Sequence, residues 1–409
     1  MRDTPKSTDA PIAPVGQGAI AYTGDDGSFR RLVTGGAFYE LVSAGFYRFW
    51  LATNIRRHLW SFTSLGGDAL EYLGTGRELL FGFLFALAIL APVYLVYFLV
   101  GLEAERYKAF ASIPLALFFV AFGQFAIYRA RRYRLHRTAW RGLRFGMEGS
   151  GWAYAGRAMA WGLAIVLSLG LAWPWALAAL ERYKMRHTFY GDLAGGFVGR
   201  GGDFFKRGWW IWGLALLGAV VLSVAFWLIE DEPGEDIGTA KSLLGLGVFA
   251  ATMVVSSAGP FLYGAYKAIQ WRWWLEGLRL GEVRAGCTLT AGAMIRNYWA
   301  MIGWCALVST AAGAIAGIII FAAVAASHAS SPGGGPPLLA FLLGGAVYLV
   351  VGLAYGVIFR IHIIQRVWKI VVASLTLHNL ELARDVAMRP GTADALGEGV
   401  ADSLAVVGF

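Results

Sequence analysis

The sequence predicts an all-α, polytopic membrane protein with about six full transmembrane helices and two re-entrant or interfacial segments, built from parallel internal repeats. The first reason is composition: 57% of the 409 residues are hydrophobic and only 15% are charged, whereas soluble domains carry about 25% charged residues. The mean hydropathy is +0.57. The other two reasons are a set of long apolar stretches and a one-sided distribution of basic residues.

Six stretches are long and apolar enough to cross a membrane, because about 20 apolar residues span the ~30 Å of hydrocarbon. None of them contains Asp, Glu, Lys, Arg or His. In chain order they cover residues 79–101, 110–128, 209–229, 243–266, 299–325 and 338–359. We expect each to be a full crossing.

Two further segments are apolar but interrupted. Residues 37–55 contain Glu40 and Arg48, and residues 158–180 are broken near Gly170 and Pro174. If only the six firm stretches cross, 32 of the 35 Lys and Arg residues fall on one side, as the positive-inside rule requires for the cytosol. A crossing at 158–180 would divide its basic flanks. We therefore expect both segments to be re-entrant or interfacial, and both termini to be cytosolic.

An internal repeat supports this topology. Residues 43–63 (SAGFYRFWLATNIRRHLWSFT) align without a gap on residues 168–188 (SLGLAWPWALAALERYKMRHT), 125 residues later. A degenerate copy, FAIYRARRYRLHRT, covers residues 125–138. Each module holds an even number of crossings, so the copies would be parallel rather than inverted.

The repeat divides the chain into five parts. The termini are expected to be cytosolic tails and the middle parts to be membrane modules, the third of them partial with one helical hairpin. The parts are residues 1–23 (disordered tail), 24–148, 149–287, 288–384 and 385–409 (C-terminal tail).

The frames SAGFYRFW…IRRHLWSFT and LGLAWPWALAALERYKMRHT resemble the YjgN-like family of bacterial inner-membrane proteins, a domain of unknown function. The resemblance extends from about residue 20 to the end of the chain, although Ser-Ala-Gly and Ser-Leu-Gly replace the family's usual Thr-Leu-Gly. It implies a multi-pass protein of the inner membrane. It brings no activity, substrate or catalytic residue to this chain.

Three arginines at equivalent repeat positions are the first candidate site. Arg57, Arg132 and Arg182 could surround a cytosolic mouth that holds anionic lipid or phosphate, because guanidinium groups match phosphate geometry. The alternative is that they only anchor the topology.

Glu40 and Arg48 are the second candidate, as a possible intramembrane polar pair. They lie eight residues apart, so on one helix they would share a face. Ionisable residues in a membrane often mark a functional site. The alternative is an interfacial helix whose charged ends reach the water.

The sequence shows no catalytic motif and no metal-ligand spacing. No two of the six histidines lie three or four residues apart, and no HExxH, GxSxG or P-loop pattern occurs. We therefore expect no catalytic residues, no metal, no cofactor and no enzymatic activity.

The two functions left open are a transporter, channel or anionic-lipid-handling protein, and a structural or scaffolding membrane protein that recruits cytosolic partners. Membrane lipids are the expected partners. The formal charge of +9 reflects basic cytosolic loops on this interpretation and does not indicate nucleic acid. A continuous polar cavity between the helical hairpins would favour the first function, and a filled apolar centre the second.

Overall fold

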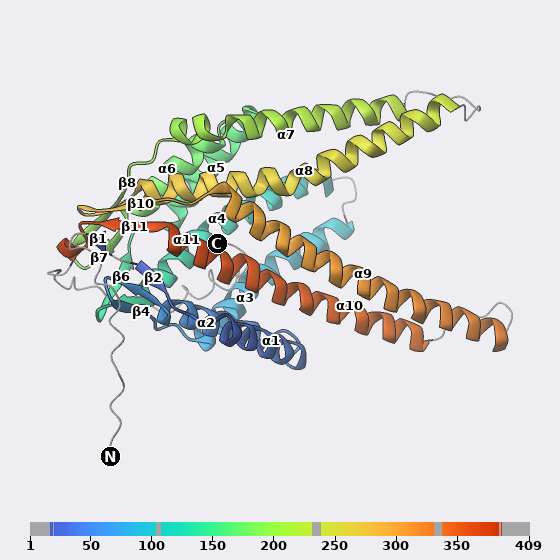
Figure 1. Cartoon of the computed structure of the whole chain (residues 1–409), viewed down its shortest axis with the longest axis horizontal. Helices are drawn as coiled ribbons and strands as arrows, with labels where there is room; N and C mark the ends of the chain where they lie inside the picture. The colour runs from blue at the N-terminus through green and yellow to red at the C-terminus, as the bar shows by residue number, and fades with distance from the viewer. Residues whose placement is uncertain are drawn as a thin grey trace, which may run out of the picture.

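The protein has a helical part and a β-sheet part, arranged end to end. A computed structural model describes residues 17–18, 20–103, 108–230, 239–330, 338–383 and 386. The strands gather at one end of the molecule, and pairs of long helices extend away from them (Figure 1).

Among the described residues, six long helices are apolar and long enough to cross a membrane, which is the number of crossings predicted from the sequence. They form three long hairpins, α3–α4, α7–α8 and α9–α10. Their bounds are α3 Gly76–Glu103, α4 Lys108–His136, α7 Gly201–Glu230, α8 Thr239–Gly277, α9 Ala291–Ser330 and α10 Leu338–Phe359. α10 continues through a π-helical segment, η2 (Arg360–Arg366), into α11 (Val367–Ser374).

The long helices carry large apolar side chains on their outer surfaces. Phe81, Phe321 and Tyr348 are 67%, 77% and 79% exposed. An apolar surface of this extent is unfavourable in water, so it faces lipid. α8 and α9 have 39 and 40 residues. At a rise of about 1.5 Å per residue, each helix is longer than the ~30 Å thickness of the hydrocarbon layer. Both helices therefore reach beyond the membrane.

The two interrupted segments of the sequence form short helical hairpins. The first short hairpin is α1 (Asp26–Val42) with α2 (Arg48–Ser61), and the second is α5 (Gly151–Leu167) with α6 (Trp173–Arg186). Both ends of each hairpin connect directly to strands. Each hairpin therefore leaves the sheet end and returns to it.

The turns of the two short hairpins are built alike. Ala44 and Gly45 have φ values of 49° and 88°, and Leu169 and Gly170 have 51° and 89°. Glycine favours such a conformation because it has no Cβ. In each turn a serine hydroxyl accepts a hydrogen bond from the backbone N–H group four residues later. The distance is 2.8 Å for Ser43 and 2.9 Å for Ser168. These turns interrupt the segments 37–55 and 158–180.

In the described part of the chain, eleven short strands form one antiparallel sheet, which the prediction of an all-α fold missed. Four β-hairpins connect successive helical hairpins, and single strands stand at the ends. The strands are β1 Gln17–Gly18, β2 Ile20–Tyr22, β3 Thr63–Leu65, β4 Asp68–Tyr72, β5 Thr138–Trp140, β6 Leu143–Met147, β7 Thr188–Tyr190, β8 Leu193–Phe197, β9 Leu278–Leu280, β10 Val283–Cys287 and β11 Leu375–His378. Two-residue loops such as Gly66-Gly67, with φ of 60° and 94°, match the twist of tight β-hairpins.

The sheet returns on itself. Its order is β1-β11-β10-β9-β8-β7-β6-β5-β4-β3-β2, and the two outermost strands, β1 and β2, are separated by one residue in the chain. β1 pairs with β11 through Gln17 and His378, and β2 pairs with β3 through Ile20 and Leu65. The strands therefore form a ring, with the chain's first strands completing it.

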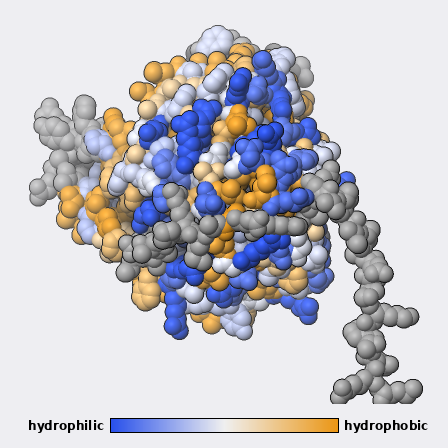
Figure 2. All heavy atoms as spheres, turned by 90° about the vertical axis from the view of Figure 1, so that its left-hand side faces the viewer, coloured by the Kyte–Doolittle hydropathy of each residue, from blue (hydrophilic) through white to orange (hydrophobic). Residues whose placement is uncertain are grey.

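The interior of this ring is apolar and filled. Trp140, Tyr190 and Val283 from three different strands pack against Leu380 and Ala383, which belong to the 3₁₀ segment η3 (Leu380–Ala383). Val386 also packs against this cluster. Figure 2 shows the sheet end, where hydrophilic residues surround a smaller apolar area.

The expected tails need one correction. Residues 17–18 and 20–22, inside the segment 1–23 expected to be disordered, are strands of the sheet. They have this structure because β3 and β11 supply backbone partners that the sequence alone does not reveal. Residues 1–16 lie outside the described residues, and so does the C-terminal tail 385–409 except Val386.

Candidate functional site

The expected polar pair, Glu40 and Arg48, lies on two different helices. α1 ends before the turn and α2 begins after it, so the face shared by residues eight apart does not exist. Glu40 pairs instead with Arg360 of η2, whose Nη2 lies 2.8 and 3.0 Å from the two carboxylate oxygens. The Arg48 guanidinium lies 4.9 Å from the ring centres of Phe49 and Phe83. The ion pair therefore joins the first short hairpin to η2.

More polar contacts follow the same boundary. Asp26, in the first turn of α1, accepts hydrogen bonds from Gln365 at 3.0 Å and from Lys369 at 2.6 Å. Nearby, the buried Asn297 side chain donates to the backbone carbonyl of His362 at 2.8 Å. π-helical segments often occur at functional sites. Here, the side chains of Arg360 and Gln365 hold the first short hairpin against the segment that follows α10.

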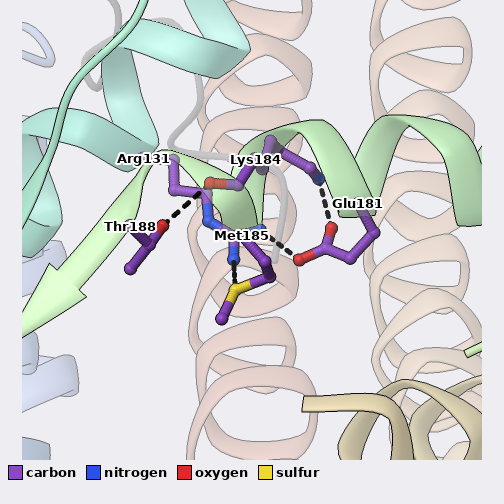
Figure 3. A network of polar contacts seen from close by, with 5 residues as sticks. All are labelled: Arg131, Glu181, Lys184, Met185 and Thr188. Carbon is purple, nitrogen blue, oxygen red and sulfur yellow. Dashed lines mark hydrogen bonds and ion pairs between the residues drawn. The ribbon is translucent and has the colours of Figure 1, made fainter. Parts of the chain in front are cut away.

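A buried charge network lies between α4 and α6 (Figure 3). Glu181 accepts from Arg131 and Lys184, each at 2.6 Å, and the other Arg131 amino group lies 3.0 Å from the Met185 sulfur. Burial alone would raise the pKa of the Glu181 carboxyl, but the two cations outweigh it and hold that pKa at about 2. Each charge has a partner, so the network ties the two helices together.

The three arginines of the repeat do not line one common mouth. Arg57 donates to the carbonyl of Gly74 at 2.8 Å, and Arg182 donates to the carbonyl of Gly199 at 3.4 Å. In both cases the acceptor lies 17 residues along the chain, just before the next long helix. Arg132 lies on α4, directly after Arg131 of the buried network. Of the three, only Arg182 lines the pocket that we consider the best candidate site.

This pocket, called the basic pocket below, has a volume of 470 Å³ and lies between the second short hairpin and the start of α7. Three cations, Arg182, Arg200 and Lys206, and one carboxylate, Asp203, line it. The formal charge of the lining is therefore +2. Its full lining is Trp161, Trp175, Ala178, Ala179, Arg182, Arg200, Gly201, Gly202, Asp203 and Lys206.

A glycine contact positions the pocket. A Cβ on Gly201 would lie 2.6 Å from the Cα of Trp175, which is too close for any other residue without displacement of the backbone. Glycine therefore lets α7 begin directly against α6. The N–H groups of the first turn of a helix have no partners within the helix and favour anions. The geometry thus places a helix N-terminus and three cations around one cavity, which suits an anionic ligand.

Sequence reasoning included Arg182 but missed Arg200 and Lys206. The signal was present in the stretch Arg200-Gly201-Gly202-Asp203, where glycines begin a membrane helix beside basic residues. What the sequence could not reveal is that this stretch packs against Trp175. Among the described residues, no three His, Cys, Asp or Glu side chains are grouped so that they could hold a metal ion.

Comparison with known proteins agrees with the resemblance seen in the repeats. The family described as "Bacterial protein of unknown function (DUF898)" matches residues 17–403, which is nearly the whole chain. No curated protein and no solved structure matches. The predicted relationship to a YjgN-like domain of unknown function is confirmed by this match. The chain belongs to the DUF898 family of bacterial proteins of unknown function, and the described part of it contains six helices long and apolar enough to cross a membrane.

Proposed function

We propose that this protein is a multi-pass protein of the bacterial inner membrane that binds anionic, phosphate-bearing headgroups in the basic pocket. The observation that supports this role is the convergence of Arg182, Arg200 and Lys206 at the start of a membrane helix. Arginine forks match phosphate oxygens, and a helix N-terminus adds N–H donors. Trp161 and Trp175 suit the membrane–water interface. The role is one of binding rather than catalysis.

The sheet end faces the cytosol in this proposal, together with both termini. The support is the distribution of charge: 32 of 35 Lys and Arg residues belong to the segments at the sheet end of the six crossings or to the terminal segments. Arg144, Arg279 and Arg284 lie on the sheet strands themselves. Basic residues are retained on the cytosolic side of a membrane. The basic pocket would then open towards the cytosolic leaflet.

We also propose that the two short hairpins dip into this leaflet as re-entrant elements. Their turns carry bare apolar side chains: Val42 and Phe46 are 70% and 52% exposed, and Leu167 and Leu169 are 76% and 93% exposed. Exposed apolar groups of this size favour a lipid environment. The helices on either side of each turn satisfy their own backbone groups, which makes such depth tolerable.

The parallel-repeat interpretation is supported by contacts that recur 125 residues apart. A Cβ on Gly76 would lie 2.9 Å from the Cα of Trp50, as Gly201 approaches Trp175. Arg57 and Arg182 both donate to a carbonyl 17 residues later. The two modules therefore share their means of starting a membrane helix. The two modules differ in charge at the positions of the basic pocket, where the first module has Thr75 and Phe81 in place of Arg200 and Lys206.

A scaffold that recruits cytosolic partners is the second candidate. It is favoured by the filled apolar interior of the sheet ring, where Trp140, Tyr190 and Leu380 meet, because a channel along this axis would need an open path. The filled interior is compatible with a scaffold role and also with lipid binding in the basic pocket, which lies outside the ring. Lipid binding distinguishes them.

The test is whether the double variant Arg200→Gln/Lys206→Gln still binds anionic lipid. Arg182 is left in place because it holds the Gly199 carbonyl. Wild type and variant are purified in a mild detergent, and thermal stabilisation by added phosphatidylglycerol is measured against phosphatidylcholine. A ligand that binds only the folded protein raises its melting temperature. We expect phosphatidylglycerol to raise the melting temperature of the wild type, and to raise that of the double variant much less.

Arg207→Gln is the matched control. Arg207 directly follows Lys206 but forms an exposed ion pair with Glu276 at 2.8 Å and does not line the pocket. It should respond to phosphatidylglycerol as wild type does. An equal response of wild type and the double variant would contradict the proposed site and favour the scaffold.

A further inference from the structure

A second cavity lies beside the basic pocket and is apolar. It has a volume of 310 Å³, and is called the apolar pocket below. Trp173 closes one side of it, and its indole N–H donates to the hydroxyl of Tyr266 on α8 at 2.7 Å. The full lining is Ile165, Gly170, Trp173, Ile211, Trp212, Ala215 and Tyr266. All side chains in this list are hydrocarbon or aromatic, so an ionic headgroup would find no partner charge there.

Three helical elements, α5, α6 and α7, contribute residues to both pockets, and α8 adds Tyr266 to the apolar one. On α5, which runs from the sheet to the turn, Trp161 lines the basic pocket and Ile165 the apolar one. At the start of α7, Asp203 and Lys206 line the basic pocket, together with Arg200 directly before the helix. Further along α7, Ile211, Trp212 and Ala215 line the apolar pocket. Near the turn of the second short hairpin, Gly170 and Trp173 line the apolar pocket, whereas Trp175 and Arg182 of α6, closer to the sheet, line the basic one. On every element the apolar pocket lies further from the sheet.

We infer that the two pockets together hold one membrane lipid, with its phosphate in the basic pocket and an acyl chain in the apolar pocket. This inference rests on the proposed function and names its ligand as a lipid rather than a free phosphate. Cavities that bind small ligands have volumes of roughly 300–1,000 Å³, and both pockets fall in this range. The polarity changes along the expected membrane normal in the direction that a phospholipid requires.

The first short hairpin lacks this site although it shares the backbone design. The residues 125 positions before Arg200 and Lys206 are Thr75 and Phe81, so two of the three cations are absent from the matching positions, although Arg77 stands where the second module has Gly202. The residue that corresponds to Trp161 is Gly36, against which Leu51 packs closely. The lipid site therefore belongs to the second short hairpin.

The experiment fills the apolar pocket and compares two probes. Ala215→Phe places a ring in the pocket, and Ala219→Phe places the same ring on an exposed position one turn further along α7 that does not line it. The probes are phosphatidylglycerol and water-soluble glycerol phosphate, each titrated by thermal shift on purified full-length protein. We expect Ala215→Phe to weaken phosphatidylglycerol binding at least tenfold and to leave glycerol phosphate binding unchanged. Ala219→Phe should affect neither.

The outcomes separate this inference from the proposed function. If Ala215→Phe binds phosphatidylglycerol like wild type, the two-pocket lipid site is overturned while the basic pocket stands. If Arg200→Gln/Lys206→Gln binds both probes like wild type, the proposed function itself fails. Unchanged glycerol phosphate binding by Ala215→Phe also shows that this variant is folded. Should it fail to fold, Ala215→Leu, a smaller insertion, is expected to weaken phosphatidylglycerol binding selectively in the same way.

Discussion

Glu40 and Arg360 form an ion pair between residues 320 positions apart. Their side chains are only 15% and 18% exposed. Glu40→Gln leaves the Arg360 cation without its partner, and we expect a loss of about 2 kcal/mol in unfolding free energy, between the values typical of exposed and of buried pairs. Chemical unfolding in detergent measures it.

The double variant Glu40→Gln/Arg360→Gln tests the same pair. Because no uncompensated charge remains, it should be more stable than Glu40→Gln alone. A double-mutant cycle isolates the coupling energy. If the two single losses simply add, Glu40 and Arg360 do not stabilise each other, and the contact is incidental.

Glu181 leads to a prediction about pH. Its pKa is held at about 2, below its ordinary value of 4.5, so its charge stabilises the fold fully above pH 4.5. This contribution, about 3 kcal/mol by linkage, is lost as the pH falls towards 2. The stability difference between wild type and Glu181→Gln should therefore be constant from pH 8 to pH 5 and shrink below pH 4.5.

Melting temperatures over this pH range check the prediction, with Glu276→Gln as control. Glu276 forms an exposed pair with Arg207, and exposed pairs contribute about 0–1 kcal/mol. Its removal should change stability little at any pH. A wild-type advantage over Glu181→Gln that grows towards acid would contradict the assignment.

At the scale of elements, the start of α7 depends on one glycine of a pair. A Cβ on Gly201 would lie 2.6 Å from the Trp175 Cα, whereas a Cβ on Gly202 would meet nothing within 4 Å. Gly201→Ala must push α6 and α7 apart, and we expect a loss of about 1–3 kcal/mol, as for an overpacked core. Gly202→Ala should be neutral or slightly stabilising, because alanine favours a helix.

Thermal unfolding of the two alanine variants decides this point, and phosphatidylglycerol titration adds a second measurement. Since Gly201 lines the basic pocket, Gly201→Ala should also weaken lipid binding. Equal melting temperatures for Gly201→Ala and Gly202→Ala would show that the close approach of α6 and α7 is not required.

At the scale of the whole molecule, the sheet ring depends on its first strands. Deletion of residues 1–22 removes β1 and β2, which pair with β11 and β3. The two partner strands would then present open edges, which promote aggregation. We expect a lower melting temperature and aggregates in size-exclusion chromatography. Deletion of residues 1–14, which keeps both strands, is the control, and identical behaviour of the two deletions would contradict a closed ring.

The proposed orientation makes the two ends of the molecule chemically distinguishable. In a background without Cys287 and Cys305, a cysteine at Ser330 should react with an impermeant maleimide from outside the inner membrane. A cysteine at Arg284, whose side chain is 60% exposed at the sheet end, should react only after permeabilisation. Labelling of the Arg284 position from outside would reverse the topology.

The crossings and the turns of the short hairpins could be predicted from the sequence because both are local properties. An apolar run such as 79–101 is long enough to cross a membrane, and this length does not depend on how the rest of the chain packs. The breaks near Gly45 and Gly170 follow from the residues in those turns. Of the residues that line the basic pocket, the sequence singled out only Arg182, because it lies in the segment that aligns with residues 43–63. Arg200 and Lys206 lie directly before and within the first turns of α7, outside that alignment.

The tertiary structure alone decided the closed sheet, the partner of Glu40 and the basic pocket. Strands of two to five residues, such as Thr63–Leu65, are too short to show a clear alternation, and two-residue loops such as Arg141-Gly142 were the only local sign of them. Glu40 has Arg48 eight residues away, but it pairs with Arg360, which is 320 residues away. The turn between α1 and α2 separates Glu40 from Arg48, and closure of the sheet ring brings Arg360 close to Glu40. Contacts between distant segments depend on how the whole chain packs, and sequence periodicity carries information only about neighbours.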